Sequence, residues 1–300
     1  MTSQGAGETI PHGRAESAGV SARSALGASA PWKEAIVKGV TLAWADSGAG
    51  DEIVCLHAIG HGARDFERLR SRFAAKYRVV ALDWPGHGNS GPDDVAASAE
   101  RYAELLSDFL DAASVRRPVI VGNSIGGAAA IRYAAEQPDR VRGIILENPG
   151  GLDPSDRLSR FAIGMMVRFF SAGARKAWWF PAAYRAYYRM VLPMRAAAEQ
   201  RSRITAAGIE MAPILVQAWK SFGEPAASLR PLAAQVRCPV LFAWAKRDKI
   251  IQLSRCLPAI GEFPHGRLET FDAGHAAHLE APESFESSVD KFLGSLRAAP

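Results

Sequence analysis

The chain has 300 residues, 48% of them hydrophobic and 22% charged, which suffices for one large core or for a core domain with an insertion. This composition excludes a disordered or fibrous protein, and no apolar run approaches the roughly 18 residues of a membrane span. The net charge of +5 is uneven, because residues 153–231 contain 12 Lys and Arg against 5 Asp and Glu.

Residues 1–30 are rich in glycine, alanine and serine and contain no apolar segment typical of a secretory signal, so we expect a flexible tail. The three cysteines, Cys55, Cys238 and Cys256, are scattered and have no metal-binding spacing. They fit a reducing compartment, and we therefore expect a cytoplasmic protein without a metal site.

From about residue 35, segments typical of strands alternate with segments typical of helices. Strands are expected over 35–48, 52–60, 77–86, 117–124 and 141–151, and helices over 66–77, 97–113 and 125–140. The chain ends with a strand over 238–248, a helix over 253–263, a strand over 266–275 and a helix over 282–297. This alternation predicts an α/β fold, a mostly parallel sheet with helices on both faces and ligands beyond the carboxyl ends of its strands.

Residues 153–231 interrupt the alternation and contain no convincing strand. Prolines separate short helical segments there, so we expect a helical cap inserted into a core formed by residues 31–152 and 232–300. We interpret most cap arginines as lying on solvated helix faces, and Trp178, Trp179 and the tyrosines as lining the pocket or packing the cap onto the core. Contact with an anionic membrane surface is the alternative.

The stretch "GNSIG" at 122–126 matches the G-x-S-x-G nucleophile elbow and lies where a strand gives way to a helix. A serine on such a tight turn points out of the sheet at a helix N-terminus, where negative charge is favoured, and the glycines prevent clashes. We therefore predict that Ser124 is a nucleophile; the alternative is a simple helix cap.

A nucleophilic serine needs a base and an orienting carboxylate, and in hydrolases with this elbow they follow in the order Ser, Asp or Glu, His. His275 follows a strand near the C-terminus and is the predicted base, with His278 close behind. Asp248 follows a buried strand and is the predicted acid, with Glu147 as its rival.

The oxyanion hole should use two backbone N–H groups. One belongs to Ile125, the residue after the nucleophile. The other should come from the loop after "VCLHAIG", where we assign Ile59, with Ala58 as the alternative. His57 is expected to organise this loop, and His87 and Ser90 to be structural.

The motifs "LHAIG", "DWPGHGNSG", "GNSIGG", "AKRD" and "DAGH", in this order, resemble the α/β-hydrolase superfamily from about residue 40 to 298. "HAIGHGARDF" is similar to the oxyanion loop of meta-cleavage-product C–C hydrolases, and that resemblance implies that Arg201 binds the carboxylate or oxyanion of the substrate. Monoacylglycerol-lipase-like esterases have a comparable elbow. The substrate stays open, because this fold hosts many chemistries.

The first hypothesis is a serine hydrolase that cleaves a carboxylic ester through an acyl-enzyme, with no cofactor. The alternatives are a C–C hydrolase of anionic dienoic keto acids that uses the same triad and a non-catalytic ligand-binding protein. Asn123, Trp179 and His61 join Arg201 as candidate substrate-binding residues. We expect a small-molecule ester or keto-acid substrate and no nucleic-acid partner, and the oligomeric state stays open.

Overall fold

The computed structural model of the protein describes residues 32–298, together with Met1. At its centre is an eight-stranded sheet with the order β1-β2-β4-β3-β5-β6-β7-β8. The strands are β1 Trp32–Val37, β2 Val40–Ser47, β3 Glu52–Leu56, β4 Arg78–Leu82, β5 Val119–Asn123, β6 Gly143–Glu147, β7 Val240–Ala245 and β8 Gly266–Phe271. Strands β3 to β8 run parallel, which confirms the predicted α/β fold. The tail expected over residues 1–30 lies, Met1 apart, outside the described residues.

The first expected strand, over residues 35–48, is in fact a hairpin. Strands β1 and β2 pair antiparallel across the turn at Lys38 and Gly39, which have φ angles of +47° and +82°. Two consecutive residues with positive φ are characteristic of the tight turns that match the twist of a hairpin. Strand β2 also runs antiparallel to β4, so the parallel part of the sheet begins at β4.

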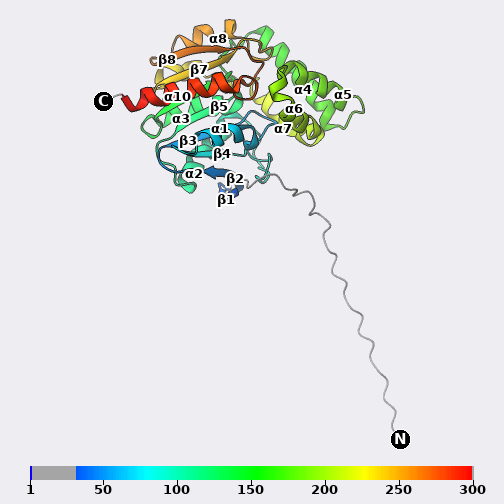
Figure 1. Ribbon diagram of the computed structural model, residues 1–300. Helices are drawn as coiled ribbons and strands as arrows, with labels where there is room; N and C mark the ends of the chain where they lie inside the picture. Colours follow the sequence, from blue (N-terminus) through cyan, green and yellow to red (C-terminus); the bar gives the residue numbers. More distant parts are fainter. Residues whose placement is uncertain (2–31, 299–300) are drawn as a thin grey trace.

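Helices cover both faces of the sheet (Figure 1). Side chains alternate along each strand, so Val54 and Leu56 of β3 face one layer of helices while Ile53 and Cys55 face the other. The first layer contains α2 (Ala99–Ala112), α3 (Ile125–Glu136) and α8 (Leu253–Ile260), and the second contains α1 (Glu67–Phe73) and α10 (Pro282–Ala298). The core is thus split by the sheet into two apolar layers.

The segment between β6 and β7 folds into helices that gather at one end of the sheet (Figure 1). They are α4 (Arg157–Ala174), α5 (Phe180–Val191), α6 (Ala198–Ala206) and α7 (Gly208–Ser221). Their own apolar cluster includes Phe170, Phe180, Tyr184 and Tyr188, all buried. We refer to this segment as the cap. Across residues 32–298, no helix combines the length and the apolar character that crossing a membrane requires.

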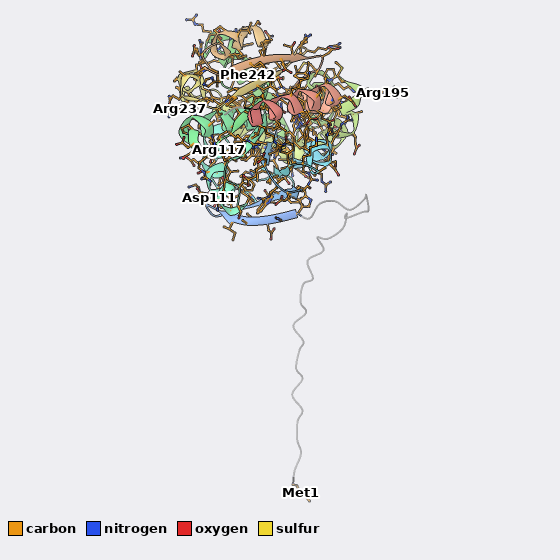
Figure 2. All side chains as sticks on the ribbon, turned by 60° about the vertical axis from the view of Figure 1, so that its left-hand side comes forward. Met1, Asp111, Arg117, Arg195, Arg237 and Phe242 are labelled. Carbon is orange, nitrogen blue, oxygen red and sulfur yellow. The ribbon has the colours of Figure 1, made fainter. Side chains whose placement is uncertain are left out.

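The sheet core generates a stability prediction. Phe242 of β7 is buried and packs edge-on against Phe263 at a centroid distance of 5.0 Å (Figure 2 labels Phe242). We expect Phe242→Ala to lower the free energy of unfolding by about 3–5 kcal/mol, because the lost contacts leave a cavity. The matched control is Leu257→Ala on α8, whose side chain is 46% exposed. Urea denaturation that shows equal losses for both variants would contradict this account.

Candidate active site

Ser124 occupies a strained turn between β5 and α3. Its φ of +55° and ψ of −116° lie outside the regions that non-glycine residues normally adopt, and such strain costs about 1–3 kcal/mol. Neighbouring glycines make the turn sterically feasible. A Cβ at Gly126 would lie 2.4 Å from the carbonyl oxygen of Leu56, and one at Gly122 would lie 2.7 Å from that of Gly126. The chain can therefore approach the neighbouring strand closely and leave Ser124 at the apex.

His275 and Asp248 lie side by side on the loops that follow β8 and β7. The Nδ1–H of His275 donates to Oδ2 of Asp248 at 2.7 Å, and both side chains are buried. The other carboxylate oxygen accepts from the backbone N–H groups of Ile250 and Ile251 at 2.7 and 3.1 Å. This arrangement fixes the orientation of the His275 ring. Its Nδ1 is engaged in the hydrogen bond to Asp248, so Nε2 is the nitrogen that is available for proton transfer.

Two opposing influences act on the pKa of His275. Burial lowers it, but the charge of Asp248 and the hydrogen bond to its carboxylate outweigh burial and bring the pKa above its ordinary value of 6.5. His275 is thus tuned toward the protonated form. An imidazole with a raised pKa accepts a proton readily.

The two rivals considered from the sequence are paired with each other. Glu147 Oε2 accepts from the backbone N–H and from the Nδ1–H of His278, at 2.9 and 3.0 Å. Both side chains are buried, and the imidazole of His278 stacks on Phe66 with ring centroids 4.4 Å apart. Glu147 is therefore paired with His278, and Asp248 is the carboxylate that contacts His275.

The loop after β3 is held by buried histidines. Nε2 of His57 accepts from the backbone N–H of Trp84 at 3.0 Å, and Nε2 of His87 accepts from that of Gly60 at 2.9 Å. Burial lowers the pKa of both imidazoles, well below 6.5 for His57 and to about 4 for His87. Both rings are therefore neutral near pH 7, as acceptance through Nε2 requires. Within this loop, Ile59 lines the same cavity as Ser124.

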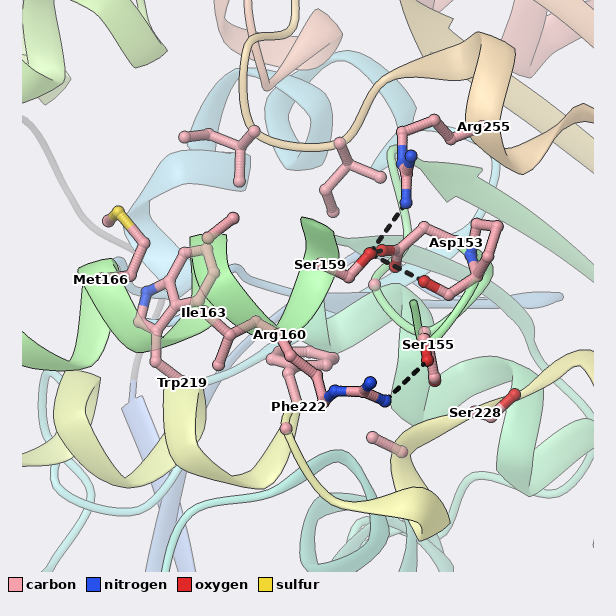
Figure 3. A pocket seen from close by; sticks show the side chains of 18 of the residues that line it. Asp153, Ser155, Ser159, Arg160, Ile163, Met166, Trp219, Phe222, Ser228 and Arg255 are labelled. Atoms are coloured by element: carbon pink, nitrogen blue, oxygen red, sulfur yellow. Dashed lines mark hydrogen bonds between the residues drawn. The ribbon is translucent and has the colours of Figure 1, made fainter. Parts of the chain in front are cut away.

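A cavity of about 610 Å³ lies between the cap and the carboxyl ends of the strands. Ser124 and Ile59 line it from the core. On the cap side the apolar lining includes Met166 of α4, Trp219 of α7 and Phe222, which follows α7 (Figure 3). At one end a polar cluster forms, in which Nη2 of Arg255 donates to Oγ of Ser159 at 2.9 Å. The cavity thus combines predominantly apolar walls with a polar end that includes charged side chains such as Asp153 and Arg255.

The four candidate substrate-binding residues lie outside the lining of this cavity. Arg201 donates through Nη1 to the backbone carbonyls of Leu192 and Met194, and Asn123 donates through Nδ2 to those of Glu147 and His275. His61 donates to Asp65 at 2.6 Å, and Trp179 lies near Phe169 on the outer part of the cap. Trp219 lines the cavity instead. The polar atoms of Arg201, Asn123 and His61 are instead hydrogen-bonded to other parts of the protein.

Comparison with known proteins decides the family. Residues 53–287, more than half of the chain, match the family described as the alpha/beta hydrolase family. The chain belongs to this family. The hydrolase is 24% identical over 260 residues to the 2-hydroxy-6-oxo-6-phenylhexa-2,4-dienoate hydrolase of Burkholderia cepacia, which covers 83% of this chain and 90% of the relative.

Solved structures share the fold of the hydrolase. A thermophilic esterase from Thermogutta terrifontis superposes with a TM-score of 0.76 at 20% identity, covering 89% of this chain and 99% of its own. The enol-lactonase from Burkholderia xenovorans LB400 superposes with a TM-score of 0.70 at 20% identity, covering 87% of this chain and 100% of its own. At these identities the likeness concerns the fold.

Two side chains of the hydrolase that the sequence motifs did not single out support the site. Asn148, with a φ of +43°, donates through Nδ2 to Oδ2 of Asp248 at 2.7 Å and accepts from the N–H of Ala245. Glu280 accepts from the N–H groups of Gly274 and His275 at 2.7 and 3.1 Å. Asn148 could have been noticed because it follows Glu147 at a strand end, whereas nothing in the local sequence marks Glu280.

The His275–Asp248 pair leads to a prediction about titration. In Asp248→Asn the burial of His275 persists while the negative charge of Asp248 is lost, so the pKa of His275 should fall. NMR titration of the labelled imidazole measures this change. The control is Asp272→Asn, which removes an exposed carboxylate paired with Arg247. An unchanged pKa in Asp248→Asn would contradict the assigned cause.

Proposed function

We propose that the protein hydrolyses carboxylic esters through a Ser-His-Asp triad formed by Ser124, His275 and Asp248. The observation that carries the proposal is the strained Ser124 at the wall of an apolar cavity of about 610 Å³. The buried His275–Asp248 pair at 2.7 Å supports it, because a nucleophilic serine needs such a base and its orienting group.

In this mechanism Oγ of Ser124 attacks the ester carbonyl and its proton passes to Nε2 of His275. Asp248 stabilises the resulting imidazolium, which then gives the proton to the leaving alcohol. Water, activated by the same imidazole, attacks the acyl-enzyme and releases the acid and free Ser124. The raised pKa of His275 suits a group that must first accept and then return a proton.

The negative charge that develops on the carbonyl oxygen would be stabilised by backbone N–H groups. Ile125 is the first residue of α3, so its N–H has no partner one turn earlier within the helix. Ile59 lines the same cavity as Ser124 and belongs to the loop that His57 and His87 hold in place. We propose these two N–H groups as the oxyanion hole, aided by the positive end of the α3 dipole.

The cavity lining favours an apolar acyl or alcohol group. Its walls carry methionine, isoleucine and tryptophan side chains from α4 and α7, together with Phe222 directly after α7. C–C bond cleavage of a dienoic keto acid remains the second candidate, because a relative that aligns over most of the chain is named as such a hydrolase. Parallel assays of p-nitrophenyl esters and of 2-hydroxy-6-oxo-6-phenylhexa-2,4-dienoate separate the two. C–C turnover that exceeds ester turnover would overturn the ester assignment.

The nucleophile is tested by Ser124→Ala, with Ser155→Ala as the control because Ser155 also lines the cavity. We expect Ser124→Ala to lower kcat for p-nitrophenyl butyrate by about 10⁴-fold or more, since loss of any triad member removes covalent catalysis. Labelling by a fluorophosphonate probe should disappear in parallel. Ser155→Ala should keep both the native kcat and the labelling. A Ser124→Ala protein with native turnover would exclude this mechanism, and a native chain that resists the probe would favour a non-catalytic binding protein.

The pH dependence follows from the direction of the His275 shift. Neutral imidazole is the active base, so kcat/KM should rise as the pH increases through the pKa of His275. Because that pKa lies above 6.5, the midpoint of the rise should also lie above pH 6.5. A pH–rate profile of ester hydrolysis by the native enzyme gives the midpoint, and a value clearly below 6.5 would contradict the role of His275.

A further inference from the structure

The outer part of the cap exposes large apolar side chains. Trp178, in the turn between α4 and α5, is 91% exposed, and Phe161 and Leu158 on α4 are 68% and 61% exposed. Trp178 therefore neither lines the cavity nor packs the cap onto the core, contrary to expectation. We call the exposed side chains of residues 157–191 the cap face. Its large apolar members are Leu158, Phe161, Met165, Trp178, Trp179 and Met190.

The arrangement of the cap face follows from helix periodicity. Leu158, Phe161 and Met165 are three, four and seven residues apart, so they share one side of α4, while Phe170 on another side is buried in the cap. A shallow apolar groove of about 410 Å³ runs between α4 and α5, lined by Met165, Met166, Phe169, Ala183, Ala186, Tyr187 and Met190. In Figure 1 α5 lies at the outer edge of the cap, beside α4. Met165 and Met190 thus connect the exposed side of α4 and the exposed side of α5 through this groove.

Charge on the cap face has a single sign. Residues 157–191 include seven cationic side chains and not one Asp or Glu. All seven are exposed: Arg157, Arg160, Arg168, Arg175, Lys176, Arg185 and Arg189. The cap's ion pairs within the described residues use other side chains, namely Asp156 with Arg255, Arg203 with Asp65 and Arg230 with Glu262. The cap face thus presents cations with no acidic partner among the described residues.

We propose that the cap face binds the surface of an anionic phospholipid membrane. Apolar and tryptophan side chains that project from a basic helical surface are suited to the headgroup boundary, where the apolar groups enter the acyl region and the cations contact lipid phosphates. A second copy of the chain is disfavoured as an occupant, because two identical cationic surfaces would repel one another. The charge complementarity therefore selects an anionic lipid partner.

The cap face adjoins the cavity that contains Ser124. Leu158, Arg160 and Met165 line that cavity, and Met165 and Met166 also line the outer groove. A membrane bound to the cap face would consequently lie next to an edge of the cavity. This binding goes beyond the proposed ester hydrolysis and does not need Ser124, so the two proposals can fail separately.

The binding is tested by vesicle sedimentation of the full chain. We expect it to sediment with vesicles of phosphatidylcholine and phosphatidylglycerol, and to stay unbound with phosphatidylcholine alone. Added salt should weaken the binding, because it screens the contacts with phosphate. Ser124→Ala should bind as the native chain does. Absence of binding to anionic vesicles would overturn the proposal, even if ester hydrolysis is intact.

Two variant pairs locate the surface. Phe161→Ser/Trp178→Ser removes apolar groups of the cap face, and its control Ile36→Ser/Leu257→Ser removes exposed apolar groups elsewhere. Arg168→Gln/Arg189→Gln removes two cap-face cations. Its control Arg116→Gln/Arg117→Gln makes the same charge change (Figure 2 shows Arg117 on the opposite side of the view from Arg195 of the cap).

We expect each cap-face variant to lower vesicle partitioning at least roughly tenfold and each control to change it less than roughly twofold. All four variants should keep native hydrolysis of a water-soluble ester, since none changes the proposed triad. Equal effects of variants and controls would overturn the assignment to the cap face. Binding of a single-stranded oligonucleotide that depends on the same residues, without vesicle binding, would overturn the lipid partner.

Discussion

The close approach of α3 to the end of β3 is the constraint on which the site depends. Gly126 lies so near the backbone of Leu56 and His57 that no side chain fits between them. The turn before α3 must therefore be tight, and Ser124 adopts a backbone conformation that only the surrounding structure can maintain. The same contact brings the start of α3 next to the loop that contains Ile59. The positions of the proposed nucleophile and of its proposed oxyanion donors thus have the same geometric cause.

The cap and the His275 loop are connected through Glu280. Besides the amides of Gly274 and His275, its carboxylate accepts from the N–H of Met194 in the cap. Pro193 also packs so closely on Gly274 that a Cβ there would lie 2.3 Å from its Cδ atom. Burial raises the pKa of Glu280 even though several N–H donors oppose the shift. Cap position and the orientation of the proposed base are therefore linked, with Glu280 as the common contact.

Three buried histidine–carboxylate pairs lie around the candidate site. His275 pairs with Asp248, His278 with Glu147, and His61 with Asp65, each through Nδ1. In Asp65 burial opposes ionisation, but the charges of His61 and Arg203 prevail and lower its pKa to about 2. Because Arg203 belongs to α6, its ion pair with Asp65 also joins the cap to the core. Of the three pairs, only His275–Asp248 follows the carboxyl ends of two neighbouring strands, β8 and β7.

Local sequence was sufficient for the alternation of strands and helices, for the elbow at Ser124 and for the loops that contain Asp248 and His275. Hydrophobic periodicity and glycine spacing are properties of neighbouring residues, so they can be recognised without knowing how distant parts of the chain pack. The hairpin at Lys38 and Gly39 was missed because two short strands of similar composition read as one.

Contacts between distant residues could not be predicted in the same way. Nothing near Glu280 indicates that it will contact Met194. Strand-end position and chain order favoured Asp248 over Glu147 in the sequence, but only the folded structure shows that Asp248 contacts His275. The arginines of the cap look alike in the sequence, yet Arg201 satisfies backbone carbonyls while Arg168 and Arg189 remain exposed. The sequence by itself determined most elements of the core and indicated the hydrolase family. Only the tertiary structure decided which buried polar groups pair and which side chains line the cavity, because those outcomes depend on how elements far apart in the chain pack together.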